Sequence, residues 1–308
     1  MAAPVALPCI LGPTGAGKSA AALALARTIP GPVRIINADS RQIYRDFPLI
    51  TAQPSPAEQA EFPHLLYGFL PLTEKLGAGA YARLADAAIR ESLAAGALPI
   101  LVGGTGLYLQ ALFTGMAPIP EIPEEILAHW QKMYAAEGGP ALHQRLLRHD
   151  PEYAAKIHAQ DRQRLTRALA VLQATGKPFS QWHKIQPAAP AYRAVKVGVG
   201  LPLSDLEIRI KQRLKAMLEA GALEEARRAF ARFPDPSAPG WSGIGCRELL
   251  ACLNGSLNLE QSLELWFRNT RAYAKRQYTW FRRDREITWF SPDQALGLTA
   301  PALALCNI

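Results

Sequence analysis

The stretch from residue 12 to residue 19 has the residue types and the spacing of a loop that binds phosphate groups. It reads GPTGAGKS, which fits the pattern G-x-x-x-x-G-K-[ST], and it lies between an apolar run and an alanine-rich helical run. Its residues are Gly12, Pro13, Thr14, Gly15, Ala16, Gly17, Lys18 and Ser19. Backbone N–H groups and the positive end of a helix dipole face the anion in such a loop. The alternative is a chance match in a glycine-rich turn. The pattern predicts a phosphate or diphosphate site, with Lys18 on the phosphate oxygens and the Ser19 hydroxyl on a Mg²⁺ ion.

Asp39 is the next residue whose type and position could do chemistry. It directly follows the apolar run 33–38, which is typical of a buried strand. An aspartate placed after a strand beside a phosphate site often holds magnesium or accepts a proton. Asp39 is therefore predicted to be a metal-shell carboxylate or a general base, or else to cap the following turn with its side chain. Ser40 and Gln42, beside it, could contact a substrate or simply be solvated.

A third loop, Gly103-Gly104-Thr105, follows another buried-type strand at residues 98–102. Glycines there allow the backbone to approach a ligand closely, and the start of the next helix offers a second anion cradle. The other interpretation is a tight strand-to-helix turn with Thr105 as the helix cap, and both can hold together.

The basic residues are concentrated in the segment 268–285. Seven Lys and Arg residues against one Asp give this segment +6 of the chain's net charge of +8. Four aromatic residues are interleaved with them, which is typical of contacts to single-stranded or loop RNA, although a charged helix face is often only solvated. A second basic cluster lies at 161–167. Two basic clusters and one phosphate site indicate a small phosphorylated substrate and a large polyanion.

The order of the elements predicts how these loops are positioned. Strand-type runs at 5–11, 33–38 and 98–102 alternate with helical runs at 20–29 and 79–95, and a further strand is expected at 65–70. This alternation predicts an α/β fold, a P-loop NTPase-like parallel sheet with helices on both faces. Ligands bind beyond the carboxyl ends of such strands, so the three loops should form one site.

Three prolines between residues 118 and 123 end this alternation. The chain then has a helical pattern up to residue 176, with separate helices expected at 124–136 and 141–149. We therefore expect a catalytic core of residues 1–120 and 190–308 and a small all-helical insertion domain at 121–189. The α/β pattern resumes with a strand at 194–201. Ser204-x-x-Glu207 predicts a capping box for the next helix, and a long amphipathic helix is expected at 259–283.

The composition indicates the compartment. No apolar run has the length of a membrane span, and the N-terminus has no signal pattern. Four cysteines, at positions 9, 246, 252 and 306, show no C-x-x-C spacing, as is usual in a reducing compartment. We expect a cytoplasmic protein without membrane association, and a monomer because no apolar helix face lacks an obvious internal partner.

Six motifs, in order between about residue 7 and residue 290, resemble those of the tRNA dimethylallyltransferases (tRNA isopentenyltransferases). They are Gly12-Pro13-Thr14-x-x-Gly17-Lys18-Ser19, Asp39-Ser40-x-Gln42-x-Tyr44, Gly103-Gly104-Thr105-x-x-Tyr108, Asp161-x-x-Arg164-x-x-Arg167-Ala168-Leu169, Gly245-x-Arg247-Glu248 and Thr270-Arg271-x-Tyr273-Ala274-Lys275-Arg276-Gln277-x-Thr279-Trp280. Six motifs in sequence are highly specific, whereas the phosphate loop alone is not.

The resemblance implies transfer of a dimethylallyl group from dimethylallyl diphosphate to the exocyclic amine of the adenosine on the 3′ side of a tRNA anticodon. The diphosphate would lie on the loop at 12–19 with Mg²⁺, and Lys18, Thr105 and Arg213 would act on it. Asp39 would be the general base. ATP would not be needed.

The resemblance also implies which residues contact the tRNA anticodon stem-loop. They are Asp39, Ser40, Arg41, Gln42, Gln163, Arg164, Leu165, Thr166, Arg167, Ile244, Gly245, Cys246, Arg247, Arg271, Lys275 and Arg276. The chain departs from the family pattern at Gly15-Ala16, Arg41 and Ala170, and an expected arginine is missing from the stretch 123–128. No Cys/His zinc module follows the core, which is typical of the bacterial form.

Two other classes of function remain open from the residues alone. A small-molecule P-loop kinase would use Asp39 as base and bind ATP on the loop, but it leaves the basic segment 268–285 unexplained. A non-catalytic RNA-binding NTPase or switch would use that segment and leave the Asp39 motif without a role.

Overall fold

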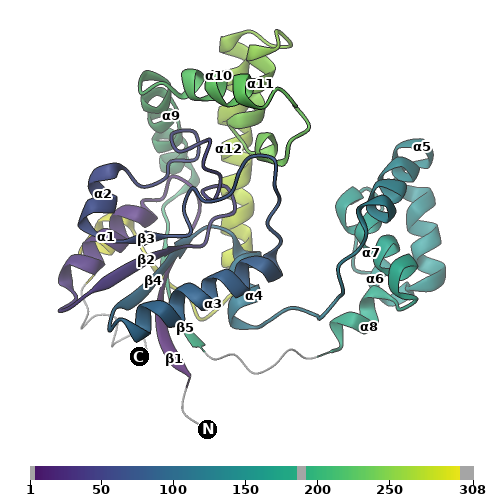
Figure 1. Ribbon diagram of the computed structural model, residues 1–308, viewed down its shortest axis with the longest axis horizontal. Helices are drawn as coiled ribbons and strands as arrows, with labels where there is room; N and C mark the ends of the chain where they lie inside the picture. The colour runs from purple at the N-terminus through teal and green to yellow at the C-terminus, as the bar shows by residue number, and fades with distance from the viewer. Residues whose placement is uncertain (1–3, 186–191, 299–308) are drawn as a thin grey trace. The chain divides into compact units, whose positions relative to one another are not determined.

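The computed structural model describes residues 4–185 and 192–298 (Figure 1). The chain divides into two compact units, one of residues 1–113 and 190–308 and the other of residues 114–189. Among the described residues, no helix is long and apolar enough to cross a membrane. Cys9, Cys246 and Cys252 are free thiols, and Cys306 lies outside the described residues.

The first unit is built on one parallel sheet of six strands in the order β3-β2-β4-β1-β5-β6. The strands are β1 (Val5–Leu11), β2 (Val33–Asn37), β3 (His64–Leu65), β4 (Leu98–Gly103), β5 (Tyr192–Val199) and β6 (Thr288–Phe290). The central strands β1 and β4 are apolar along most of their length because both of their faces are buried. The prediction of an α/β fold with a parallel sheet is confirmed.

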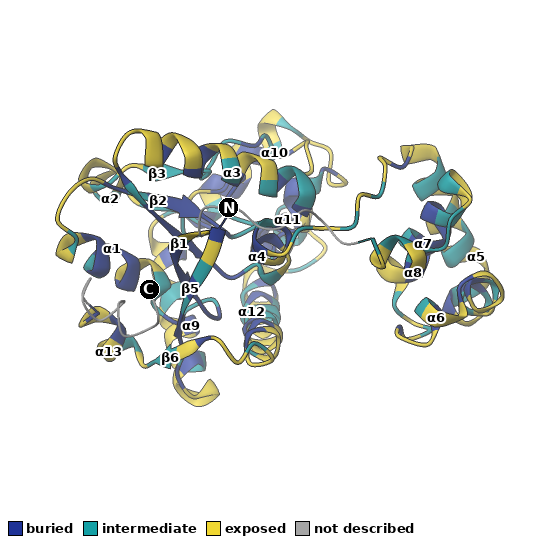
Figure 2. Cartoon of the chain, turned by 90° about the horizontal axis from the view of Figure 1, so that it is seen from below, coloured by how far each residue is buried: buried dark blue, intermediate teal, exposed yellow. Residues whose placement is uncertain are grey.

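Helices cover both faces of this sheet. They are α1 (Lys18–Thr28), α2 (Pro56–Glu61), α3 (Ala78–Ala94), α4 (Gly106–Phe113), α9 (Leu203–Glu219), α10 (Ala222–Arg232), α11 (Cys246–Leu253), α12 (Leu259–Phe281) and α13 (Pro292–Leu296), with a 3-10 turn at Pro239–Ser242. Figure 2 shows how α3 and α12 bury one side and expose the other. The unit is therefore a three-layer structure with two separate apolar cores.

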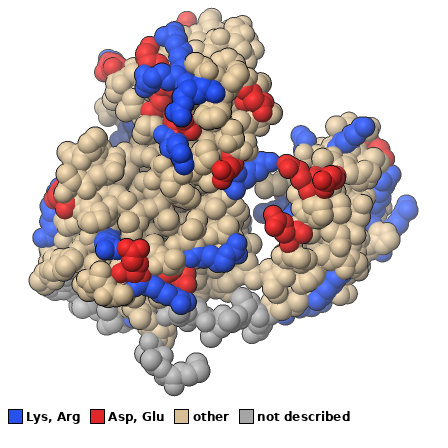
Figure 3. Space-filling view, viewed as in Figure 1, with Lys and Arg blue, Asp and Glu red and all other residues tan. Residues whose placement is uncertain are grey.

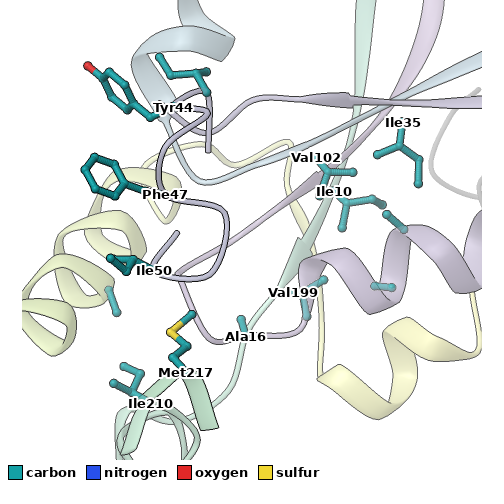
Figure 4. Close-up of a cluster of buried hydrophobic side chains, with 14 of the residues drawn as sticks. Ile10, Ala16, Ile35, Tyr44, Phe47, Ile50, Val102, Val199, Ile210 and Met217 are labelled. Carbon is teal, nitrogen blue, oxygen red and sulfur yellow. The ribbon is translucent and has the colours of Figure 1, made fainter. Parts of the chain in front are cut away.

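Successive residues of β1 belong to different cores because strand side chains alternate between faces. Ile10 packs with α1 and α9, whereas Leu7 and Leu11 pack with α3 and α4. The first of these cores is drawn in Figure 4, and it also contains Phe47 and Met217. Residues 43–50, after β2, are thereby fixed against α9 beside the phosphate loop.

The second unit consists of α5 (Glu124–His149), α6 (Pro151–Ala154), α7 (Arg162–Thr175) and α8 (Phe179–His183). The two helices expected at 124–136 and 141–149 lie within α5, which is interrupted at Gly138, where φ is 81°. Leu142 and Leu146 of α5 pack against Leu165 and Leu169 of α7. This unit therefore has its own small core.

Two local expectations were wrong. The strand expected at 65–70 ends after Leu65, because Leu66 has a φ of 61° and Gly68 a φ of 54°, which interrupt an extended backbone. The capping box at Ser204 and Glu207 does not form, because α9 begins at Leu203 and places both residues inside its first turns. Glu207 pairs with Arg271 of α12 instead.

Candidate functional site

The phosphate loop joins β1 to α1 in a conformation that leaves the start of the helix open. Gly17 precedes α1 in the left-handed region, with a φ of 96°, and no side chain caps the helix. A Cβ at Gly12 would overlap the carbonyl of Val199 on β5, so only glycine fits there. The first N–H groups of an uncapped helix lack intrahelical partners and can bind an anion.

Two cations lie beside this loop. Lys18 donates a hydrogen bond from Nζ to the Pro13 carbonyl at 2.9 Å. Burial lowers the Lys18 pKa from its usual 10.5 to about 8; nearby Asp39 raises it, and Arg213 lowers it further. Burial also lowers the Arg213 pKa, and no carboxylate of the described residues lies within ion-pair distance of this side chain. Both cations would be stabilised by a bound anion.

Asp39 follows β2 and is held by its own strand. The Asn37 side chain accepts a hydrogen bond from the Asp39 N–H at 2.8 Å and donates one to the Asp39 carbonyl at 3.0 Å. Asp39 Oδ1 accepts the Arg41 N–H at 2.9 Å. One carboxylate oxygen therefore caps the turn, as one interpretation of the sequence held, while no hydrogen bond to the other is recorded among the described residues.

Thr105 connects the third loop to the Asp39 turn. Its hydroxyl accepts the Ser40 N–H at 2.9 Å and donates to Ser40 Oγ at 3.2 Å. Tyr273, from α12, lies close to the Thr105 side chain, and burial raises the Tyr273 pKa. The carboxyl ends of β2 and β4 thus bring Asp39 and Thr105 together at one edge of the sheet, as predicted.

A cavity of about 480 Å³ opens at this edge. Among its lining residues are Thr14, Asp39, Ser40, Arg41, Arg213, Ile244, Arg247, Asn269, Thr270, Tyr273 and Arg276. A second cavity of about 440 Å³ is lined by Ser19, Leu23, Leu49, Ala52, His64, Tyr67, Arg213 and Met217, among others. Arg213 and Met217 line both cavities, and each cavity contains one residue of the phosphate loop. The loop therefore lies between two spaces of ligand size.

Several predicted tRNA contacts have structural partners as well. The Arg41 guanidinium donates to the Gly240 carbonyl at 3.0 Å and to Ser242 Oγ at 3.4 Å, and it lies over the Tyr44 ring. The Gln42 amide donates to the carbonyls of Thr51 and Ala52. These two side chains join the Asp39 turn to its neighbouring loops.

The loop before α11 presents one charged side chain to the first cavity. Arg247 is 61% exposed beside the fully buried Glu248, which also accepts the Gly245 N–H at 2.6 Å. Cys246 is fully buried, and burial raises its pKa to about 12. Of the four predicted contacts in this loop, Ile244 and Arg247 line the cavity, whereas Gly245 and Cys246 support the helix start.

The predicted contacts on α12 face two ways. Arg276 lines the first cavity, and together with Lys275 it also lines a shallow hollow on the outer side of the helix. Arg271 pairs with Glu207. The hollow has Trp280 at its edge, with 42% of that residue exposed. An exposed basic and aromatic face is therefore present on this helix.

The predicted contacts on α7 belong to the second unit. Gln163 and Arg164 are exposed, and Arg167 is half-buried. Leu165 and Thr166 are buried and hold the helix in the core of that unit. Of the predicted contacts on this helix, Gln163, Arg164 and Arg167 therefore have side chains available for binding.

Among the lining or supporting residues that sequence reasoning missed are Tyr67, Asn269, Tyr273 and Gln277. Gln277 could have been noticed in the sequence because it is a polar residue on the apolar face of an amphipathic helix, the face that also carries Trp266, Ala274 and Phe281. No comparable pattern marks Tyr67, which belongs to an irregular segment after β3.

The fold and the loop define the class: a P-loop α/β protein with a ligand-sized cavity on either side of its phosphate loop. Residues 42–284 match the family model described as IPP transferase, and the chain belongs to this family. It is 54% identical over 279 residues to the tRNA dimethylallyltransferase of Maridesulfovibrio salexigens. The aligned residues cover 91% of this chain and 90% of that protein. It is 56% identical over 290 residues to the one of Nitratidesulfovibrio vulgaris strain DP4, covering 94% and 93%.

Solved structures agree with the family assignment. The full-length tRNA isopentenylpyrophosphate transferase of Bacillus halodurans matches with a TM-score of 0.68 and 30% identity, covering 99% of this chain and 95% of that one. A eukaryotic dimethylallyltransferase acting on tRNA matches with a TM-score of 0.78 and 27% identity, covering 94% and 74%. The resemblance drawn from the six motifs is confirmed.

Proposed function

We propose that this chain is a tRNA dimethylallyltransferase. It transfers the dimethylallyl group of dimethylallyl diphosphate to the exocyclic amine of the adenosine on the 3′ side of a tRNA anticodon, and diphosphate leaves. The observation that carries the proposal is the phosphate loop between two cavities, with Asp39 and Ser40 at one of them and Arg213 at both. The names of the similar proteins support it.

The donor diphosphate binds at the start of α1. The uncapped helix end, Lys18 and Arg213 supply positive charge where negative charge grows as the allylic C–O bond breaks. The Ser19 hydroxyl is a hard oxygen donor of the kind that Mg²⁺ prefers, and it would hold the ion beside the diphosphate. When bound, Mg²⁺ would neutralise part of the leaving group's charge. In this reaction the loop stabilises a departing diphosphate and does not bind a nucleotide.

The acceptor adenine enters the cavity of about 480 Å³. An exocyclic amine is a poor nucleophile because its lone pair is delocalised into the ring, so orientation is a large part of the catalysis. Asp39 accepts a proton from the amine nitrogen as the new N–C bond forms and the C–O bond breaks. Thr105 holds the Asp39 turn through Ser40.

The anticodon stem-loop binds to basic and polar side chains of both units. Those of the first unit are Arg247, Arg271, Lys275 and Arg276, and those of the second unit are Gln163, Arg164 and Arg167. Lys and Arg side chains also gather around α9 and α10 on the face drawn in Figure 3. The adenosine leaves the loop stack to reach the site, as bases do in other enzymes that modify them. We propose that the enzyme acts as a monomer in the cytoplasm.

The test is incorporation of label from dimethylallyl diphosphate into unmodified tRNA with Mg²⁺ present and ATP absent. Label should appear in a tRNA that carries adenosine on the 3′ side of the anticodon. It should not appear in the same tRNA with guanosine at that position. No label in either RNA, with ATP hydrolysed when ATP is supplied, would overturn the proposal in favour of an ATP-using enzyme.

A further inference from the structure

The side chain of Gln277 joins the phosphate loop to the loop after β4. Its Oε1 accepts the Thr14 N–H at 2.8 Å, and its Nε2 donates to the Gly104 carbonyl at 2.9 Å. These partners lie 263 and 173 residues away in the sequence. Gln277 is only 4% exposed, so its amide is shielded from water and both of its hydrogen-bonding ends are used.

The surrounding backbone is shaped to admit this side chain. A Cβ at Gly104 would overlap the Gln277 amide, and a Cβ at Gly106 would overlap the Trp280 ring. Between them, Thr105 lies close to Tyr273. Three consecutive loop residues therefore meet successive turns of one face of α12, since residues 273, 277 and 280 share that face. Gly104 is glycine because Gln277 occupies the space of its side chain.

This contact fixes the distance between two functional loops. Thr14 belongs to the diphosphate cradle, and Gly104 precedes Thr105, which holds the Asp39 turn through Ser40. Gln277 touches none of the proposed reacting atoms, because its two polar ends bond to backbone groups. It can influence the reaction only through the geometry of the loops it joins.

We propose that Gln277 is a positioning residue that sets the leaving diphosphate against the Asp39 base. The amide orients the Thr14 peptide, so that the other N–H groups of the loop converge on the anion. It also keeps the Thr105 loop at the separation that in-line attack requires. The part that concerns the reaction rests on the proposed function, whereas the part that concerns anion binding can be measured without RNA.

The experiment compares Gln277→Leu and Gln277→Glu with Phe281→Leu. Phe281 lies one helical turn further along the same buried face and packs in an apolar core, so its shortening lowers stability without touching either loop. Gln277→Leu leaves the Thr14 N–H and the Gly104 carbonyl without partners. Gln277→Glu still accepts from Thr14 but opposes the Gly104 carbonyl and brings negative charge to the anion site.

The measurements are the Kd for inorganic diphosphate with Mg²⁺ by calorimetry, the melting temperature, and kcat with separate KM values for both substrates. Both Gln277 variants should bind diphosphate about tenfold more weakly, the scale of one or two lost buried hydrogen bonds. Their kcat should fall about tenfold or more, with the KM for tRNA unchanged. Phe281→Leu should lower the melting temperature with diphosphate affinity and kcat within about twofold of wild type.

A double-variant cycle tests the contact itself. The backbone at Gly104 lies outside the left-handed region, so Gly104→Ala acts mainly by displacing the Gln277 amide. Gly104→Ala should therefore be harmful in the wild-type background and much less harmful in Gln277→Ala, where only a close approach of the methyl group to the Gly12 carbonyl remains. Additive effects would contradict the proposed contact.

Equal diphosphate affinity and kcat in wild type and Gln277→Leu, with only a lower melting temperature, would overturn the inference and make Gln277 purely structural. In that case the wild-type protein still binds diphosphate, and only the comparison of variants contradicts the role of Gln277. If the wild-type protein itself binds no diphosphate in the presence of Mg²⁺, the proposed function fails first, and the inference falls with it.

Discussion

The lowered pKa of Lys18 makes donor binding depend on pH in a range where few other groups titrate. Burial and the neighbouring Arg213 bring the Lys18 pKa to about 8 in the free protein. A bound diphosphate places negative charge next to the ammonium group and raises that pKa again. Binding is therefore accompanied by proton uptake above pH 8, and the affinity for the donor should fall as the pH rises.

The size of the effect follows from the charged fraction of Lys18. With a pKa of about 8, roughly nine tenths of the free protein carries the charge at pH 7 and roughly one tenth at pH 9. If the bound state stays charged, the Kd for dimethylallyl diphosphate should rise about tenfold between these pH values. The terminal phosphate of the donor has its second ionisation near pH 6, so the donor contributes little to this change.

Calorimetry with dimethylallyl diphosphate and Mg²⁺, without RNA, measures this at pH 7, 8 and 9. Lys18→Arg is the matched control, because a guanidinium stays charged throughout this range. Its Kd should change less than about twofold. A wild-type Kd that stays constant from pH 7 to pH 9, or a control that shows the same tenfold loss, would refute the assignment of a titrating Lys18 at the donor site.

Three further predictions concern single residues. Asp39→Asn should lower kcat about a hundredfold or more with the tRNA Kd unchanged, by rapid quench and filter binding, and a loss of binding would make Asp39 a recognition residue instead. Arg213→Met should raise the melting temperature of the ligand-free protein, because it removes a half-buried, desolvated cation that has no ion-pair partner among the described residues, and it should weaken donor binding. An unchanged or lower melting temperature would contradict that account of Arg213. Lys275→Ala should reduce the slope of log Kd for tRNA against log salt concentration by about 0.7–0.9. The control is Arg27→Ala on α1, which removes a surface cation paired with Glu61 and should leave the slope unchanged. Equal slopes for both variants would assign Lys275 to the solvated surface.

The parts of the site that depend on local chain geometry could be predicted from the sequence. The glycines of the phosphate loop mark the turn between β1 and α1, and three of them adopt a positive φ. Asp39 and Thr105 could be placed together because each follows a parallel strand, and the carboxyl ends of parallel strands meet at one edge. Neither inference requires knowledge of how distant segments pack.

The parts that depend on distant packing could not be predicted. Gln277 acquires its role only because α12 crosses the loops at Thr14 and Gly104, far from it in the sequence. The Ser204 capping pattern was wrong because α9 begins at Leu203, before Ser204, and Glu207 pairs with Arg271 of α12. Local patterns place a residue on its helix, but the tertiary contact gives the Gln277 side chain its role.

The most direct test of the central claim is the stoichiometry of one reaction mixture. Purified protein, Mg²⁺, dimethylallyl diphosphate and unmodified tRNA are mixed without ATP, and the released diphosphate and the modified nucleoside are both quantified. The proposed function predicts one diphosphate released for each adenosine that carries a dimethylallyl group on its exocyclic nitrogen. A requirement for ATP, or diphosphate release without any modified adenosine, would contradict it.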